Sequence, residues 1–256
     1  MNAFQALILG AVQGLTEFLP ISSSGHLVLV QAFLGFSESL VEFDVILHIG
    51  TLFAVFLFFY KKILSLHWPE LWVIGVGTIP AVVVGFLFKE YIETAFATPL
   101  YVAVEIMISG GLNFYTHYLL NKKEPEVVVS EIGKISNKQA TFIGVLQAIS
   151  ISPGISRSGA TVWAGVFSKL NRQTAFEYSF LLSIPAILGA VVLELADGIS
   201  FAAVPIGPMI IGLVTSFVLG LATLKLLQYM IQKANFAVFG WYCIVLGVCS
   251  FLVLQQ

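Results

Sequence analysis

The sequence predicts an all-α, polytopic membrane protein with about six transmembrane helices and two re-entrant helical hairpins in an inverted-topology repeat. Three observations lead to this prediction. Of the 256 residues, 58% are hydrophobic and only 10% are charged, whereas soluble domains carry about 25% charged residues. Apolar stretches recur along the chain at close to the length of about 20 residues that a helix needs to cross a bilayer. The two halves of the chain also resemble each other.

This composition excludes a water-soluble enzyme and a disordered chain, because too few charged residues are available to cover a surface that faces water. The formal net charge of −2 provides no basic footprint for nucleic acid. The N-terminal segment MNAFQALILGAVQG has no lysine or arginine before its apolar run, so we expect it to belong to the mature protein. Cys243 and Cys249 are too far apart on the last apolar stretch to indicate a disulfide or a metal pair.

Six apolar stretches are predicted to cross the membrane: 43–60, 71–88, 98–120, 174–195, 203–227 and 236–254. Two further apolar regions, 4–34 and 140–170, are interrupted by PISSSGH (20–26) and SPGISRSG (152–159). Proline, glycine and runs of serine are poor helix formers. Non-helical backbone persists at membrane depth only where it is buried in protein or lines a wet cavity. We therefore predict that both regions are broken, re-entrant hairpins.

The repeat halves are predicted at approximately 1–120 and 139–233, with a polar cytoplasmic linker at 121–138 and an extra C-terminal helix at 236–254. Residues 5–25 placed over residues 139–159 give eight identities in 21 positions. If each hairpin returns to the side it came from, ten lysines and arginines lie on one side of the membrane and only Lys89 on the other. The positive-inside rule then makes the linker cytoplasmic and places both termini outside. The two hairpins enter from opposite sides, and we expect them to meet near the midplane.

Both interrupted regions carry polar side chains, which are costly at membrane depth and indicate function. The first offers His26 and Glu17, with Gln13 one helical turn before Glu17 on the same face. The second offers Arg157 in a loop of small residues, which lets backbone N–H groups approach an anion while the guanidinium adds a bidentate fork. The candidate phosphate-binding residues are Ser22, Ser24, Gly25, Ser156, Arg157, Ser158, Gly159 and Thr161.

This set of side chains suits phosphoryl transfer, in which positioning and cationic stabilisation dominate. The candidate catalytic residues are Glu17, Ser23, His26 and Arg157. Glu17 and Gln13 are candidate ligands of a divalent cation, since such ions favour hard oxygen ligands. We expect His26 to deprotonate Ser23 or a water that attacks phosphorus, with phosphorylation of His26 itself as the alternative.

Three other polar side chains in the apolar stretches are expected to be structural. His48 follows Asp44 by one helical turn and is expected to form a hydrogen bond with it. Glu105 lies in the middle of a predicted span, and we expect it to pair with a serine, threonine or asparagine at a helix interface.

The motifs QGLTEFLPISSSGHL (13–27) and SPGISRSGAT (152–161) closely resemble those of the bacterial undecaprenyl-diphosphate phosphatase family, the bacitracin-resistance type. FDVILHIGTLFAV (43–55), TIPAVVVG (78–85) and FEYSFLLSIPAILGA (176–190) resemble it too, so the likeness covers nearly the whole chain. It implies an enzyme of the cell membrane that hydrolyses undecaprenyl diphosphate to undecaprenyl phosphate and inorganic phosphate with Mg²⁺ or Ca²⁺, at a site open to the outer face. This activity recycles the lipid carrier for peptidoglycan synthesis and confers bacitracin resistance. Where this chain has Gln13 the family often has glutamate, which leaves Glu17 as the main carboxylate.

Two other classes of protein compete with this interpretation. A lipid-phosphate flippase would use the same broken helices, because inverted repeats with broken helices are also transporter architecture. A type-2 phosphatidic acid phosphatase is excluded, since it needs a second histidine after the arginine and none follows Arg157. The expected partners are a prenyl diphosphate lipid, membrane lipids and optionally a second copy in a homodimer, with no nucleic acid.

Overall fold

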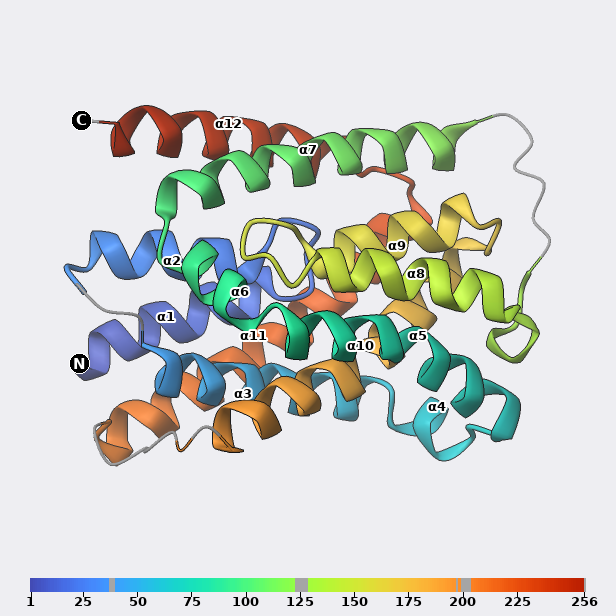
Figure 1. Cartoon of the computed structure of the whole chain (residues 1–256), viewed down its shortest axis with the longest axis horizontal. Helices are drawn as coiled ribbons and strands as arrows, with labels where there is room; N and C mark the ends of the chain where they lie inside the picture. Colours follow the sequence, from blue (N-terminus) through green and yellow to red (C-terminus); the bar gives the residue numbers. More distant parts are fainter. Residues whose placement is uncertain (37–39, 123–128, 197, 199–203, 256) are drawn as a thin grey trace.

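The computed structural model describes residues 1–36, 40–122, 129–196, 198 and 204–255. Within these ranges the chain forms α-helices and one short 3-10 turn, η1 (Ile132–Lys134). Most helices run along the long axis of the molecule (Figure 1). Residues 123–128 of the predicted linker lie outside the described residues.

Five of the described helices are long and apolar enough to cross a membrane: α3 (Val41–Phe58), α5 (Trp68–Leu87), α10 (Arg172–Ala196), α11 (Ile206–Gln232) and α12 (Ala237–Leu254). Helices α6 (Lys89–Phe96) and α7 (Pro99–Asn121) are long and apolar enough only when taken together, and they are bent by 97° at the break between them. A short helix, α4 (Tyr60–Leu64), follows α3. The all-α membrane fold is thus confirmed. Helix α6 was not expected, because its sequence KEYIETAF is too polar to stand out by hydropathy.

The two broken regions form hairpins of short helices, as predicted. The first comprises α1 (Ala3–Thr16, 14 residues) and α2 (Ser23–Phe33, 11 residues). The second comprises α8 (Asn137–Ile149, 13 residues) and α9 (Arg157–Phe167, 11 residues). None reaches the length of about 20 residues that a bilayer requires. In Figure 1 the first hairpin enters from the end that holds both termini, and the second enters from the opposite end.

The repeat is interlocked, because each hairpin packs on a long helix of the other half. Helix α1 lies along α11, α8 lies along α5, and α7 pairs with α12. Glycines allow these close approaches: a methyl group at Gly10 of α1 would lie 2.8 Å from the carbonyl oxygen of Gly212, and one at Gly144 of α8 would overlap the carbonyl of Gly77. Helix α12, which we expect to lie outside the repeat, packs along α7.

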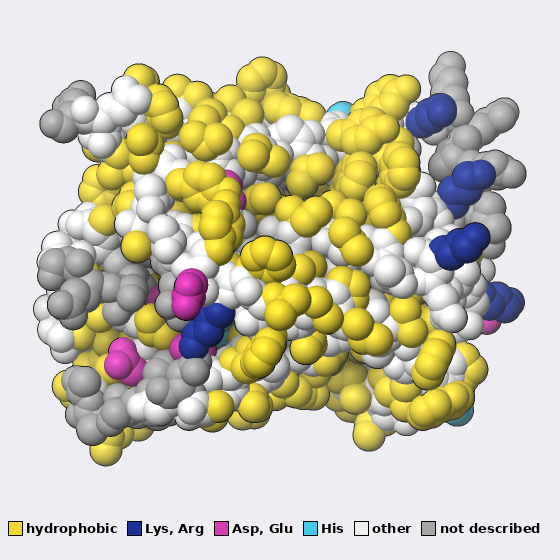
Figure 2. Space-filling model, in the orientation of Figure 1, with side chains coloured by type: hydrophobic (Ala, Val, Ile, Leu, Met, Phe, Trp, Pro, Cys, Tyr) yellow, Lys and Arg dark blue, Asp and Glu magenta, His cyan; other side chains and the backbone are white. Residues whose placement is uncertain are grey.

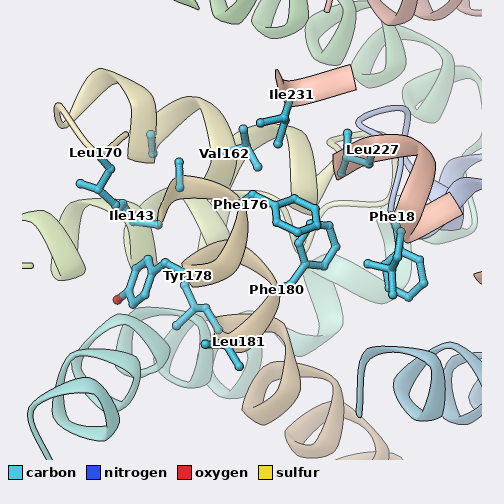
Figure 3. Close-up of a cluster of buried hydrophobic side chains, with 14 of the residues drawn as sticks. Phe18, Ile143, Val162, Leu170, Phe176, Tyr178, Phe180, Leu181, Leu227 and Ile231 are labelled. Carbon is cyan, nitrogen blue, oxygen red and sulfur yellow. The ribbon is translucent and has the colours of Figure 1, made fainter. Parts of the chain in front are cut away.

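Aromatic side chains from both halves meet in the core beneath the hairpins (Figure 3). The ring of Phe18, which follows α1, packs edge-on against Phe180 of α10 with centroids 5.6 Å apart. Tyr178 is buried in the same cluster, on the side of Phe180 away from Phe18 (Figure 3), and its hydroxyl donates to the backbone oxygen of Val73 at 2.7 Å. This core fixes the end of α1, from which the first loop starts.

The surface has the division expected of a membrane protein. Hydrophobic side chains cover most of the face shown in Figure 2. Most of the lysine and arginine side chains visible on this face gather at one end of the molecule, and a further basic side chain lies toward the other end beside acidic ones. Both termini lie at the other end (Figure 1). This separation is the one that the charge pattern of the sequence predicts.

Candidate active site

The tips of the two hairpins are joined by hydrogen bonds between their loops. The hydroxyls of Ser22 and Ser24 both donate to the backbone oxygen of Pro153, that of Ser24 at 2.9 Å. In the opposite direction, Ser158 donates to the backbone oxygen of Leu19 at 3.1 Å. The two broken segments therefore form one rigid junction, as the inverted repeat predicts.

Each hairpin restarts as a helix through the same local device. Ser22 accepts a hydrogen bond from Gly25 N at 3.3 Å, and Ser156 accepts one from Gly159 N at 3.2 Å, so both serines cap the helix that follows. A helix N-terminus attracts anions through its free N–H groups and its dipole. Ser22 has φ 66°, in the left-handed region that residues with a side chain seldom adopt. Two helix N-termini thus start at the junction.

Glu17 is the centre of the polar cluster at this junction. Its Oε2 accepts hydrogen bonds from Ser23 Oγ at 2.5 Å and from Gln13 Nε2 at 3.0 Å. Its Oε1 lies 2.5 Å from Arg157 Nη2 in an ion pair between the two hairpins. Among the described residues, Arg157 Nη1 is buried and has no hydrogen-bond partner. The structure therefore brings Gln13, Glu17, Ser23 and Arg157 together and leaves one guanidinium nitrogen available to a ligand.

His26 lies at the same junction but faces the C-terminal helix. Its Nδ1 is 2.6 Å from the backbone oxygen of Ser22, and its Nε2 is 2.8 Å from the hydroxyl of Tyr242 on α12. The two rings are stacked, with centroids 5.6 Å apart. The hydroxyl of Ser23 points to Glu17, so the expected pairing of Ser23 with His26 is replaced by a pairing of Ser23 with Glu17. No pattern in the sequence indicates Tyr242, because its contact depends on how α12 packs.

Glu105 of α7 holds the loop between α8 and α9 through hydrogen bonds. Its carboxylate accepts hydrogen bonds from the hydroxyl of Ser152 and from Gly154 N, the latter at 2.9 Å. One turn further on, Ser109 donates to the oxygen of Gly154 and accepts from Ser156 N, both at 2.9 Å. The expectation that this carboxylate pairs with a serine at a helix interface is confirmed.

The remaining hydroxyls predicted to bind phosphate are used within the protein. Ser156 and Ser158 share a hydrogen bond of 3.2 Å. Thr161 donates to the backbone oxygen of Arg157 at 2.8 Å and lies 2.6 Å from the hydroxyl of Ser179. Together with the loop contacts of Ser22 and Ser24, these bonds shape the junction. A direct role of these hydroxyls in phosphate binding stays a prediction.

A second imidazole, which the sequence led us to regard as structural, lies beside the carboxylate cluster. His48 of α3 hydrogen-bonds the backbone oxygen of Asp44 at 2.7 Å, and its Nε2 is 3.8 Å from Glu17 Oε2. The Asp44 side chain accepts from Gln31 of α2 at 2.8 Å. The spacing of Asp44, His48 and Thr51 is a polar stripe on one face of an apolar helix, and this stripe is the signal that indicates the contact.

The fold and the junction define an integral membrane protein with a buried site in which a carboxylate, a guanidinium, a serine hydroxyl and helix N-termini converge between two broken helices. Residues 6–249 match the family model described as "Bacitracin resistance protein BacA". The chain therefore belongs to the BacA family.

Curated relatives match along nearly their whole length. The chain is 38% identical to a protein of Methanosphaera stadtmanae, covering 99% of this chain and 98% of the relative. It is 38% identical to one of Carboxydothermus hydrogenoformans, with 100% and 98% covered, and 37% identical to one of Desulforapulum autotrophicum, with 98% of each covered. Each relative is named undecaprenyl-diphosphatase. The flippase alternative has no support in these similarities.

Proposed function

We propose that this protein hydrolyses undecaprenyl diphosphate to undecaprenyl phosphate and inorganic phosphate. Membership of the BacA family and the name shared by its relatives support this activity. The observation that carries the proposal is the Ser23–Glu17–Arg157 cluster at the meeting point of two helix N-termini. It combines a nucleophile, a proton acceptor and a phosphate-binding cation inside the membrane, where a lipid headgroup reaches them.

In the chemistry that we propose, Ser23 attacks the terminal phosphorus and its proton passes to Glu17 Oε2, the atom that it already contacts at 2.5 Å. The new Oγ–P bond forms as the bond from phosphorus to the bridging oxygen breaks, which releases the prenyl monophosphate. Water then hydrolyses the phosphoserine. His26 is a second candidate for proton transfer, but its ring contacts Tyr242, so we assign the first transfer to Glu17 and deprotonation of the water in the second step to His26.

The arrangement also links substrate binding to activation of the base. In the free enzyme, Arg157 occupies one oxygen of Glu17, which makes the carboxylate a poor proton acceptor. A diphosphate competes for the guanidinium, whose planar fork matches phosphate oxygens. When Arg157 moves its hydrogen bonds to the substrate, Glu17 loses its counter-charge and becomes more basic.

A divalent cation fits the same cluster. The side-chain Oε1 of Gln13 is fully buried and has no partner among the described residues, and the amide nitrogen of the same group donates to Glu17 Oε2 at 3.0 Å. Half a turn of the amide would bring Oε1 to the carboxylate. Oxygen donors of this kind are those that Mg²⁺ and Ca²⁺ take. A cation held by Gln13 and Glu17 would neutralise charge on the phosphoryl oxygens during transfer.

For the orientation in the membrane, we propose that the cation-rich end faces the cytoplasm and that both termini and the mouth of the first hairpin face outward. The gathering of lysines and arginines at the end opposite the termini supports this orientation. The spent carrier lipid would then reach the site from the outer leaflet.

Phosphate release by purified, detergent-solubilised protein from prenyl diphosphates of 15 to 55 carbons tests the activity, with and without a chelator. We expect Ser23→Ala to abolish most release, and Ser24→Ala, whose hydroxyl donates to the backbone oxygen of Pro153, to retain most of it. Phosphate trapped during turnover as an acid-stable, alkali-labile adduct would identify phosphoserine. An acid-labile, alkali-stable adduct would instead identify phosphohistidine, and a protein that releases no phosphate would exclude the proposed activity.

A further inference from the structure

His48 is held with one ring nitrogen turned toward the carboxylate of Glu17. Its Nδ1 lies 2.7 Å from the backbone oxygen of Asp44, and a carbonyl oxygen only accepts, so Nδ1 carries the proton. In the neutral ring, Nε2 then has a free lone pair. That nitrogen faces Glu17 Oε2 across 3.8 Å. Two electron-rich atoms thus point at each other with room for a cation between them.

The Gln13 amide lies beside Glu17 in the same cluster. The amide nitrogen of Gln13 donates to Glu17 Oε2 at 3.0 Å and lies 3.5 Å from Thr51 Oγ1, one turn from His48 on α3. The amide oxygen of Gln13 is buried without a partner among the described residues. Leaving a buried acceptor unpaired is unfavourable, and a bound cation removes that cost.

We propose that His48 Nε2, Glu17 and Gln13 together bind one divalent cation, with His48 as its nitrogen ligand. This inference rests on the proposed function for the presence of a cation, and adds the ligand that sets which cation is preferred. The hydrogen bond from Nδ1 to a backbone oxygen is the outer-shell contact that metal-binding histidines nearly always make, because it fixes the tautomer. Among the described residues no three His, Cys, Asp or Glu side chains gather as a metal site, so this one depends on the Gln13 amide.

The cation takes the place of one hydrogen bond that Glu17 accepts. A carboxylate offers about four lone-pair positions over its two oxygens, and Oε1 is the one paired with Arg157. Oε2 accepts from the Ser23 hydroxyl and from the Gln13 amide nitrogen and also faces His48. Half a turn of the Gln13 amide exchanges its nitrogen and its oxygen, which frees a lone pair of Oε2 and turns the amide oxygen toward the cation.

One nitrogen and two oxygen donors select a particular class of cation. Mg²⁺ and Ca²⁺ are hard ions that take oxygen ligands, whereas imidazole suits transition metals, and Mn²⁺ accepts both kinds of donor. We therefore infer that this protein binds Mn²⁺ more tightly than Mg²⁺ or Ca²⁺. The competing arrangement is an ion pair between a protonated His48 and Glu17, in which no cation lies between them.

Electron paramagnetic resonance of Mn²⁺ bound to the purified full-length protein tests the proposal without relying on activity. We expect the bound ion to show hyperfine coupling to one ¹⁴N nucleus, replaced by ¹⁵N coupling in protein labelled with ¹⁵N-histidine. His48→Gln, which replaces the imidazole with an amide, should lose the coupling, weaken Mn²⁺ binding by about tenfold or more and reduce the preference for Mn²⁺ over Mg²⁺. The matched control is His67→Gln at the start of α5, and His26→Gln tests the other imidazole at the junction; both should keep the coupling.

Bound Mn²⁺ without nitrogen coupling in the wild-type protein would overturn the assignment, as would coupling that survives in His48→Gln. Tighter Mn²⁺ binding by His48→Gln would favour the ion pair instead. Because the labelled wild-type protein carries the main result, a variant that fails to fold leaves the test intact. Phosphate release measured on the same samples separates the two proposals. Release without Mn²⁺ binding would contradict the cation site alone. Nitrogen coupling without release would contradict the phosphatase activity alone.

Discussion

At the scale of single residues, the main feature is an ion pair that bridges two halves of a chain inside the membrane. Glu17 and Arg157 are 140 positions apart in sequence and 2.5 Å apart in space. Removing one partner of a buried pair is costly, roughly 3–5 kcal/mol, because the other charge is left uncompensated. The pair therefore holds both side chains in place until a phosphate offers the guanidinium an alternative partner.

Replacing Arg157 with lysine tests the geometry of this cation rather than its charge. Lysine keeps the charge but loses the planar fork, and we expect kcat/KM for prenyl diphosphate hydrolysis to fall by about 10- to 100-fold, the loss of one or two charge-assisted hydrogen bonds. Arg172, the other arginine of the chain, donates to backbone oxygens of Gln232 and Leu120. Arg172→Lys is the matched control and should retain most activity. Near wild-type turnover by Arg157→Lys would argue against Arg157 as the diphosphate ligand.

The contact between His26 and Tyr242 leads to a second prediction. We expect His26→Ala to lower kcat by about 10² or more, as does the loss of a group that transfers protons, while lipid binding changes little. Tyr242→Phe removes only the hydroxyl that lies 2.8 Å from His26 Nε2 and keeps the stacked ring, so its effect on kcat should be much smaller. Steady-state kinetics of both variants check this order. A fully active His26→Ala enzyme would show that His26 takes no part in the chemistry.

At the scale of elements, the two broken hairpins could be predicted from the sequence because proline, glycine and runs of serine, which are poor helix formers, cluster at both interruptions. The same feature located Gln13, Glu17, Ser23 and Arg157, which do lie together. The side chains of other helices that contact these residues could not be predicted from the sequence. The contact of Tyr242 with His26 depends on how α12 packs against the first hairpin, and no local pattern encodes that packing. The polar stripe on α3 marks His48 as a candidate but does not show that it faces Glu17. The pairing of Ser23 with Glu17 rather than His26 likewise depends on where the first loop turns.

Close helix contacts make the position of the first hairpin sensitive to glycine. A side chain at Gly10 meets the backbone of Gly212 at 2.8 Å, so Gly10→Val should push α1 away from α11 and shift Glu17. We expect a lower melting temperature in detergent and a loss of phosphatase activity. Gly189→Ala is the matched control, because a methyl group there has open space around it. If Gly10→Val melted like the wild type and stayed active, tight packing of α1 on α11 would be contradicted.

At the scale of the whole molecule, neither half holds a complete site. The first hairpin packs on α11 and the second on α5, so each half supplies the surface that the other needs. Expressing residues 1–124 and 125–256 as separate chains tests this interdependence. We expect neither fragment to release phosphate alone, and co-expression to restore a substantial part of the activity. Pairing the first fragment with a second that carries Arg157→Lys should stay nearly inactive, and an active single fragment would refute the interlocked arrangement.

The packing of each hairpin on the other half of the chain also determines when the site can form during synthesis. Glu17 leaves the ribosome among the first residues, but its guanidinium partner follows 140 residues later and the helix that supports α1 later still. At ~5–20 residues per second, that interval is on the order of 10 s. During this interval the Glu17 carboxylate has no counter-charge, which makes it costly to insert the first hairpin into the membrane. We therefore expect this hairpin to insert late. The nascent enzyme thus acquires its active site only when nearly the whole chain has been made.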